Sequence, residues 1–308
     1  MGMYQKKKIK TQKKSDDKEK TLPSAGINWF PGHMAKTRRR ISEQMKIIDA
    51  VAEVVDARIP ISSRNPDLDE ITHGKPRIIL LNKCDMADPA ATAKWVEYYK
   101  NHGIVAIQVD CKNGRGVGAF KEAVKTLLSE KLALNAQKGM AGKPLRVMVV
   151  GIPNVGKSSF INRISGNARA KAENRPGVTR GNQWFLVDKQ LELLDTPGVL
   201  WPKFQDETVG EHLAFTGAVT DRILDTELLA VKLLDILCRD YPELLSARYK
   251  TESLPEDAYD ALCLIGKKRG MMIKGGETDT LRAANMLLEE YRTCKIGRIT
   301  LERVEDNA

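Results

Sequence analysis

Three short stretches of this 308-residue sequence have residue types suited to binding phosphate, Mg²⁺ and a purine base. In chain order they are Asn-Lys-Cys-Asp at 82–85, Gly-Ile-Pro-Asn-Val-Gly-Lys-Ser at 151–158 and Asp-Thr-Pro-Gly at 195–198. Each follows a run of apolar residues, which predicts that all three lie at the ends of buried parallel strands. Ligands of open α/β sheets bind at that edge, so the three stretches could belong to one site.

The stretch at 151–158 has the pattern of a phosphate-binding loop. Apolar residues at 145–150 predict a strand before it, and a helix is expected from Lys157 onward. Gly151 and Gly156 allow a tight loop whose backbone N–H groups point at phosphate oxygens, while Lys157 reaches the β- and γ-phosphates. A glycine-rich turn that binds nothing is disfavoured by the full pattern between strand and helix. We assign nucleotide contacts in this loop to Asn154, Val155, Gly156, Lys157, Ser158 and Ser159.

The stretch at 195–198 supplies a carboxylate and a glycine after another strand, expected at 191–194. Asp195 can hold Mg²⁺ through water, and the Gly198 N–H can contact the γ-phosphate. Asp-Thr-Pro-Gly alone is also a common turn sequence. Its position downstream of a phosphate loop favours the nucleotide interpretation, with the Ser158 hydroxyl as a second Mg²⁺ ligand.

The stretch at 82–85 has the residues to recognise a base. Asp85 can accept hydrogen bonds from guanine N1–H and from its exocyclic amine, and adenine has no donor at either place. Asn82 and the stem of Lys83 would hold the loop and flank the ring. The three stretches together predict a domain that binds and hydrolyses GTP, and Asp85 disfavours an ATP-dependent enzyme. In an ordinary small GTPase the phosphate loop comes first, so this chain enters the fold at a different point.

The order of these motifs, with Trp-Phe-Pro-Gly-His-Met at 29–34 and Asp-Ala-Arg-Ile-Pro at 56–60, resembles that of circularly permuted GTPases. It is most similar to the bacterial ribosome biogenesis GTPase A family, also called RbgA or YlqF, over residues 27–202. The resemblance implies a GTPase that binds the maturing large (50S) ribosomal subunit, docks on its precursor RNA with GTP bound, and is released after ribosome-stimulated hydrolysis. It also implies a base-contacting loop at 110–112, with Cys111 acting through its backbone. The alternative is a GTP-dependent switch or binding module that acts on a protein partner without a ribosomal role.

The sequence leaves a gap in the catalytic machinery. Many GTPases have a water-orienting glutamine after the glycine of the third motif, but here that residue is Val199, which cannot form a hydrogen bond. His33 could position the water or accept its proton, although it could equally be an ordinary loop histidine. Asn154 resembles the asparagine that helps to coordinate K⁺ in related GTPases, and a bound K⁺ would neutralise developing charge. Thr179 is the switch threonine expected to reach Mg²⁺, unless it is an ordinary loop threonine. Mg²⁺ is thus the expected cofactor and K⁺ a candidate second one.

The elements that must position these residues follow the same apolar patterns. We expect an α/β fold: a circularly permuted P-loop GTPase domain with a mostly parallel sheet, then a small all-α domain. The expected domains are a basic arm at 1–22, the GTPase domain at 23–202 and the helical domain at 203–308. Other strands are expected at 51–55, 77–81 and 104–109, and helices at 37–48, 90–101, 117–132, 208–215, 226–239, 255–266 and 279–293.

Positive charge is concentrated at the N-terminus. Residues 1–40 contain twelve Lys or Arg and three acids, a net of +9 out of +10 for the whole chain. Such an arm is suited to a phosphate backbone, and a merely solubilising tail is the alternative. A second basic stretch, with Lys267, Lys268, Arg269 and Lys274 among glycines, could contact RNA or be a solvated loop. We therefore expect GTP or GDP and ribosomal RNA as partners.

Other features of the composition exclude some classes of protein. No stretch approaches the length of a membrane span, and the lysine-rich N-terminus lacks the apolar core of a signal peptide. The five cysteines are scattered without a paired motif, which indicates reduced thiols and neither a metal site nor a disulfide framework. We expect a cytoplasmic monomer with no membrane partner.

Overall fold

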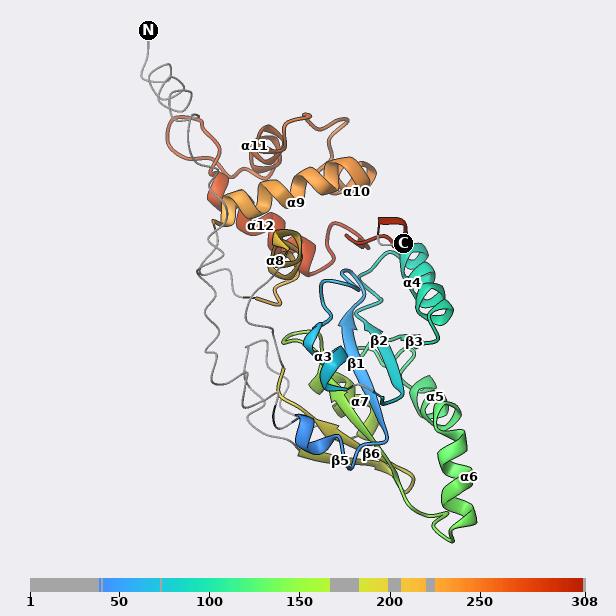
Figure 1. Cartoon of the computed structure of the whole chain (residues 1–308). Coiled ribbons are helices and arrows are strands. Elements are labelled where there is room, and N and C mark those ends of the chain that lie inside the picture. The colour runs from blue at the N-terminus through green and yellow to red at the C-terminus, as the bar shows by residue number, and fades with distance from the viewer. Residues whose placement is uncertain are drawn as a thin grey trace.

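The computed structural model of the chain describes residues 39, 41–72, 74–166, 183–198, 206–219 and 225–306. Its centre is a six-stranded sheet in the order β3-β2-β1-β4-β6-β5, shown in Figure 1. The strands are β1 (Ala50–Asp56), β2 (Arg77–Asn82), β3 (Val105–Gln108), β4 (Leu145–Val150), β5 (Gln183–Asp188) and β6 (Leu191–Asp195). All neighbouring strands are parallel except β5 and β6. The predicted α/β fold with a mostly parallel sheet is confirmed.

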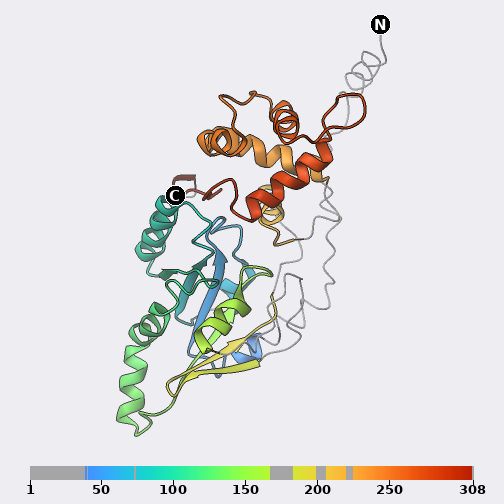
Figure 2. The same cartoon turned by 180° about the vertical axis from the view of Figure 1, so that it is seen from behind.

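Helices cover both faces of the sheet, which explains why its central strands are apolar on both sides. On one face, Val54 of β1 belongs to the same buried cluster as Phe120 and Phe160. On the other face, Val55 of β1 clusters with Trp95. The helices of this part are α3 (Asp67–Ile71), α4 (Pro89–Asn101), α5 (Ala119–Leu127), α6 (Ser129–Gln137) and α7 (Lys157–Ser165). Helices α5 and α7 therefore lie on one face of the sheet and α4 on the other (Figure 2).

Two predicted helices are wrong in extent. The helix expected at 117–132 is two helices, because Leu128 leaves helical geometry (φ −108°, ψ 22°) between α5 and α6. Phe120, Val124 and Leu128 form the buried face, whereas α6 has no buried residue that would keep it on the same axis. The helix expected at 37–48 is helical only up to residue 44 within the described part, and a turn at 45–47 follows. That turn lets the chain bury Ile48 and enter β1.

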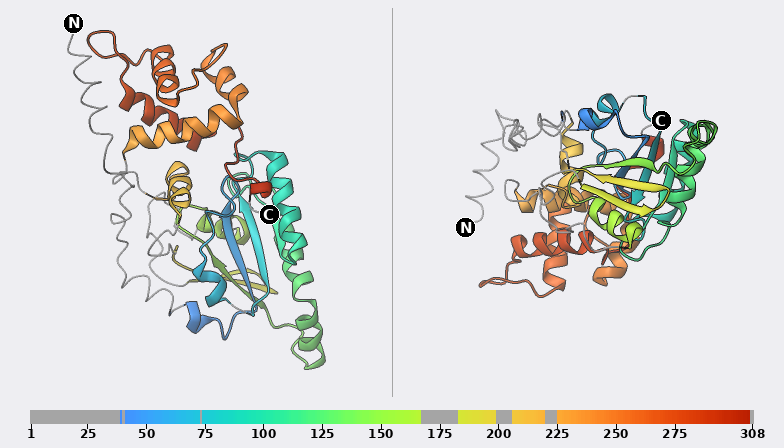
Figure 3. Two further views of the ribbon diagram at one scale, coloured as in Figure 1. Left: turned by 45° about the horizontal axis from the view of Figure 1, so that its top comes forward. Right: turned by 90° about the horizontal axis from the view of Figure 1, so that it is seen from below.

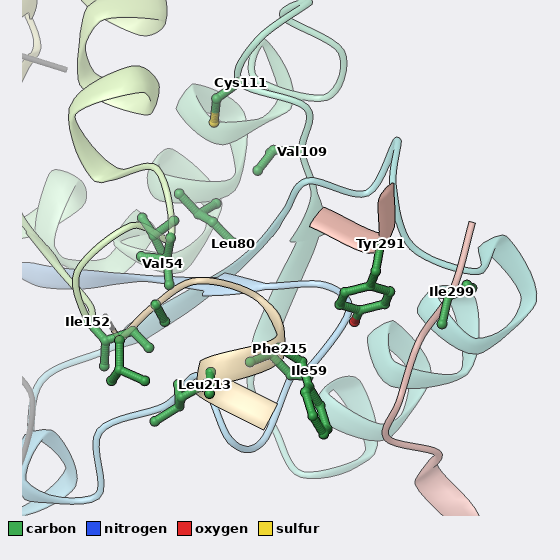
Figure 4. Packing of buried hydrophobic residues seen from close by; sticks show 14 of the residues in the cluster. Val54, Ile59, Leu80, Val109, Cys111, Ile152, Leu213, Phe215, Tyr291 and Ile299 are labelled. Carbon is green, nitrogen blue, oxygen red and sulfur yellow. The ribbon is translucent and has the colours of Figure 1, made fainter. Parts of the chain in front are cut away.

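The C-terminal part is helical, as expected, and lies over the carboxyl ends of the strands (Figures 1 and 2). Its apolar side chains belong to the same continuous cluster as one face of the sheet; Figure 4 shows Ile152 of the 151–158 loop with Leu213, Phe215 and Tyr291 of this part. The helices are α8 (Glu207–Phe215), α9 (Thr226–Asp240), α10 (Pro242–Tyr249), α11 (Ala258–Lys268) and α12 (Thr280–Arg292). The sequence did not predict α10, α3 or the edge strand β5.

After α12, the chain returns to the sheet and ends near α4 (Figure 3). The Trp95 indole Nε1–H donates to the Glu302 carbonyl oxygen at 2.9 Å. The Glu302 carboxylate in turn accepts hydrogen bonds from the backbone N–H groups of Ile61 (2.6 Å) and Ser62 (3.0 Å). A short 3₁₀ turn, η2 (Val304–Asp306), follows. The last segment therefore fastens the helical part to the loop after β1.

Three absences concern only the ranges that the structure describes. In them, no helix is both long enough and apolar enough to cross a bilayer. No group of three or more His, Cys, Asp or Glu side chains is arranged to hold a metal ion. All five cysteines are free, and Cys84 and Cys111 are buried.

Candidate functional site

The three motifs meet at one edge of the sheet. Asn82 ends β2 with residues 83–85 after it, residues 151–158 follow β4, and Asp195 ends β6. These three strands all lie within the parallel part of the sheet around β1. The carboxyl ends of these strands therefore bring motifs more than a hundred residues apart in sequence into one place. The permuted order of the motifs has no effect on this geometry, because it changes where the chain begins and leaves the strand order of the sheet intact.

The phosphate loop has the tight backbone that its glycines predict, with positive φ at both of them. Gly151 and Gly156 have φ values of +144° and +102°. A Cβ atom would lie 2.4 Å from the Val54 carbonyl oxygen at the first glycine and 2.2 Å from Asn82 Nδ2 at the second. Both positions thus exclude a side chain for reasons of space as well as backbone conformation. Asn154 also has positive φ, +62°, in the region that asparagine tolerates best after glycine.

Lys157 begins α7, and its side chain folds back over the loop. Its Nζ donates to the carbonyl oxygens of Gly151 (2.9 Å) and Ile152 (2.8 Å). A Cβ atom on Gly198 would lie 3.0 Å from this Nζ, so the third motif approaches the lysine closely. Burial lowers the pKa of Lys157 to about 8, against the influence of Asp195. The ammonium group therefore lies in a poorly solvated place that an anionic phosphate would balance.

Asp195 fits the role of a Mg²⁺ ligand. It is 2% exposed, and burial raises the pKa of its carboxyl to about 6. Its Oδ1 has no hydrogen-bond partner within the described residues. A buried carboxylate oxygen without a partner is the kind of acceptor that a hard cation satisfies. Ser158 lies in the first turn of α7, and Thr196 is fixed by a 2.7 Å hydrogen bond from its Oγ1 to the Val149 carbonyl oxygen.

Asn82 connects three loops of the site. Its Nδ2 donates to the Val155 carbonyl oxygen in the phosphate loop at 2.6 Å. Its Oδ1 accepts from the Cys111 N–H at 3.2 Å, in the loop after β3. These two bonds hold the base motif against the phosphate motif, so Asn82 acts as a tether in this arrangement. The assignment of Cys111 as a backbone contact to the base stays a prediction.

The next residue of the base motif, Lys83, is anchored by a charged pair at the end of β1. Lys83 has a φ of +60°, and its Nζ donates to Asp56 Oδ2 at 2.8 Å. Asp56 also receives two bonds from the Arg58 side chain, at 3.0 and 2.8 Å. Burial opposes ionisation of Asp56, but Arg58 and Lys83 together hold the pKa of its carboxyl well below the usual range. We did not assign Asp56 or Arg58 a role from the sequence, although an acid and a base directly after an apolar strand were a usable signal.

Asp85 is half-buried at the end of this motif. Within the described residues, its carboxylate receives no hydrogen bond. It is therefore available to accept the two donors of a guanine ring, as the sequence predicts. The contact itself stays a prediction.

Asn154 lies between the phosphate loop and the helical part. Its Nδ2 donates to the Gly217 carbonyl oxygen, just after α8, at 3.0 Å. The Arg292 guanidinium holds the same turn by donating to the carbonyl oxygens of Ala214 (2.6 Å) and Phe215 (3.0 Å). These contacts fix which way the Asn154 amide points, although K⁺ coordination by its oxygen remains a prediction. His33, Thr179 and Val199 lie outside the described residues.

The fold and the motif geometry define a GTPase whose base motif precedes its phosphate motif along the chain. A family model described as 50S ribosome-binding GTPase matches residues 146–245, which include the phosphate loop and Asp195. Among solved structures, GNP-bound YlqF from Thermotoga maritima has a TM-score of 0.59 and 28% identity, covering 88% of this chain and 99% of that one. A GDP-bound YlqF structure has a TM-score of 0.61 and 29% identity, with 87% of this chain and all of the other covered.

A relative from Priestia megaterium, named Ribosome biogenesis GTPase A, is 51% identical over 90% of this chain and 96% of its own length. At that identity and coverage the relationship extends from the nucleotide motifs through the helical part. The chain belongs to the ribosome biogenesis GTPase A family. The resemblance inferred from the motif order is thereby confirmed, and the chain is a GTPase.

Proposed function

We propose that this GTPase is an assembly factor for the large (50S) ribosomal subunit. In the GTP state it docks on precursor ribosomal RNA, and subunit-stimulated hydrolysis releases it. It works as a monomer in the cytoplasm. The observation that carries the proposal is the near full-length match to relatives named for ribosome biogenesis, which includes the helical part as well as the GTPase motifs.

A basic loop between α11 and α12 supports contact with RNA. Lys267 and Lys268, the last two residues of α11, and Lys274 in the loop that follows are exposed. An antiparallel bridge between Met272 and Thr278 closes the loop around Lys274. Gly266 is needed beneath it, because a Cβ atom would lie 2.4 Å from Thr278 Cγ2. Ammonium groups on an ordered loop suit a phosphate backbone, which they bind with release of counterions.

The catalytic roles follow from the two charged groups at the phosphate loop. Lys157 would bind the β- and γ-phosphates, and Ser158, Thr179 and Asp195 would hold Mg²⁺. When bound, Mg²⁺ neutralises charge that develops on the phosphate oxygens. Because Val199 cannot orient water, we assign that role to His33, which would act once the subunit places it.

The division of the chain follows the same proposal. Residues 1–22 form a basic arm for RNA contact, residues 23–202 the GTPase domain and residues 203–308 the helical domain that docks on the subunit. Hydrogen bonds from Asn154 to Gly217 and from Arg292 to Ala214 support this division, because they join the start of the helical domain to the phosphate loop and to α12.

Co-sedimentation with large-subunit precursors tests the proposal. The full chain should co-sediment with a non-hydrolysable GTP analogue and be released with GDP. The triple variant Lys267→Ala, Lys268→Ala, Lys274→Ala should bind more weakly, with the slope of log affinity against log salt shallower by roughly 2 to 3 if each lysine contacts a phosphate. Nucleotide affinity should be unchanged.

The matched control removes three exposed lysines from the sheet domain, Lys100, Lys138 and Lys143. It carries the same change in net charge and should keep the salt slope of the original chain. Equal losses in both triple variants would mean that only net charge matters and would count against docking through the α11–α12 loop. Nucleotide-dependent capture of a protein, with no binding to precursor subunits, would favour the alternative of a switch acting on a protein partner.

A further inference from the structure

The base motif is contacted from one side by a segment more than two hundred residues later in the chain. Arg298 lies in the stretch that follows α12, and its guanidinium spans the turn that carries Asp85. Its Nη2 donates to the Cys84 carbonyl oxygen at 2.8 Å, and its Nε donates to the Ala87 carbonyl oxygen at 2.9 Å. One planar fork therefore holds the backbone immediately before Asp85 and two residues after it.

The backbone on either side of Arg298 adds to this contact. The Ile299 N–H donates to the Met86 carbonyl oxygen at 3.1 Å, and the Asp88 N–H donates to Thr300 Oγ1 at 3.1 Å. Ile299 and Thr300 are buried, whereas the side chain of Arg298 is exposed at the surface. The segment is thus anchored by its neighbours, and the arginine reaches over the turn without being part of the core.

The turn needs such support because its own bonds are few. Met86 N–H donates to the Lys83 carbonyl oxygen at 2.9 Å, and Cys84 N–H makes a long 3.3 Å bond to the Val109 carbonyl oxygen. Bidentate recognition of guanine by Asp85 requires its carboxylate to be held within a narrow range of positions. Arg298 adds the hydrogen bonds to the Cys84 and Ala87 carbonyl oxygens, one on each side of Asp85.

We propose that Arg298 is a positioning residue for guanine recognition. By clamping the Cys84 and Ala87 carbonyl oxygens, it fixes the carboxylate of Asp85 for the two donors of the base. The helical part of the chain thereby contributes to the nucleotide specificity of the GTPase domain. This inference rests on the assignment of Asp85 as the base-reading residue and is independent of any ribosomal role.

The test compares GDP with IDP, whose base lacks the exocyclic amine, so the ratio of their dissociation constants measures one of the two Asp85 contacts. In Arg298→Ala the affinity for GDP should fall by about tenfold, as for loss of a charged hydrogen bond. The ratio between IDP and GDP should move towards one. The KM for GTP should rise with kcat unchanged. Arg298→Lys offers a single ammonium group in place of a fork. Its GDP affinity and its IDP-to-GDP ratio should lie between those of the original chain and those of Arg298→Ala.

Two further variants make the outcomes distinct. Arg248→Ala, which removes an arginine bonded to Glu290 at 2.9 Å within the helical part, should leave the ratio as it is. Asp85→Asn should weaken GDP binding and admit xanthine nucleotides, because the amide offers a donor to the xanthine carbonyl. If Asp85→Asn loses guanine preference but Arg298→Ala keeps the original ratio, the role of Arg298 is overturned. If neither variant changes the preference for guanine, the base-reading assignment of Asp85 fails together with the proposed role of Arg298.

Discussion

The two halves of the nucleotide site are stabilised in different ways. The phosphate half is built from one short loop and the start of one helix, with Lys157 bonded back to carbonyl oxygens of its own loop. The base half is held by side chains from distant segments: Asn82 reaches the phosphate loop, and Arg298 reaches the base motif from the far end of the chain. Local backbone geometry shapes the first half, and tertiary contacts shape the second.

The charged side chains of the two halves also differ in how they are neutralised. In the base half, Asp56 is paired with Arg58 and Lys83, which hold the pKa of its carboxyl low against the effect of burial. In the phosphate half, burial raises the pKa of Asp195 to about 6 and lowers that of Lys157 to about 8. The base half thus has its charges matched within the protein, whereas the phosphate half has charged groups that phosphate and Mg²⁺ would match. The comparison indicates a preassembled base half and a phosphate half that is completed by its ligand.

The largest expected effect is a loss of stability when the buried ion pair of the base half is broken. Asp56→Ala leaves the Arg58 guanidinium, 2% exposed, without its counter-charge. Breaking a buried ion pair from one side typically lowers the free energy of unfolding by about 3–5 kcal/mol. Urea denaturation of the purified variant measures this loss.

A surface pair provides the control. Glu43→Ala removes the partner of Arg39, in a pair whose side chains are 58% and 83% exposed. Exposed pairs contribute about 1 kcal/mol or less, so this variant should unfold close to the original midpoint. Similar small shifts of the denaturation midpoint in both variants would mean that the pairing of Asp56 contributes little to the free energy of unfolding.

The second prediction concerns proton exchange in the phosphate half. The Asp195 carboxyl must ionise to hold Mg²⁺, and its folded pKa, about 6, is above its ordinary value. Binding of Mg²⁺ and GDP near pH 6 should therefore release protons from this group, and the Mg²⁺-dependent part of the affinity should fall as the pH drops below 6. The pKa of Lys157 is lowered to about 8, so binding near pH 8 should instead take up roughly half a proton.

Calorimetric titration in two buffers of different ionisation enthalpy measures both the proton release at pH 6 and the proton uptake at pH 8. Asp195→Asn is the matched control for the acid side, because the nucleotide's own phosphate titrates equally with either protein. The variant should lose the extra proton release at pH 6 and keep the uptake at pH 8. Identical proton release by both proteins would show that Asp195 is already ionised before the ligand binds.

The phosphate half was the more predictable from sequence, for a physical reason. The spacing from Gly151 to Ser158 encodes a local backbone shape, so the strand, the loop and the start of α7 at Lys157 were all predicted correctly. Asp195 was likewise placed at the end of its strand. The nucleotide contacts of these residues remain predictions, whereas the elements that carry them are confirmed.

The supports of the base half could not be predicted in the same way. The contact of Arg298 with Cys84 joins residues 214 positions apart, and no local pattern marks it. The same limit applies to the break at Leu128, where an apolar pattern continued but burial against the sheet stopped. The edge strand β5 was missed although residues 184–187 are apolar and suited to a strand.

The smallest expected effect concerns the point where the phosphate half meets the helical part. If the Asn154 side-chain oxygen helps to hold K⁺, intrinsic GTP hydrolysis should be faster in K⁺ than in Na⁺, and removing the side chain should erase that difference. Asn154 has a φ of +62°, so alanine there would add backbone strain to the loss of the amide. Asn154→Gly removes the side chain without that strain and is the cleaner variant.

Either variant would remove the 3.0 Å hydrogen bond from the Asn154 amide to the Gly217 carbonyl oxygen. The salt dependence of the hydrolysis rate then separates two explanations. If the amide acts only as a strut between the phosphate loop and α8, Asn154→Gly should slow hydrolysis equally in both salts. If it acts through the cation, the rate in K⁺ should fall to the Na⁺ rate, with GDP affinity nearly unchanged because the loop glycines and Lys157 remain. A K⁺ acceleration that survives Asn154→Gly would remove this residue from the cation site and leave it as a link between the two halves of the molecule.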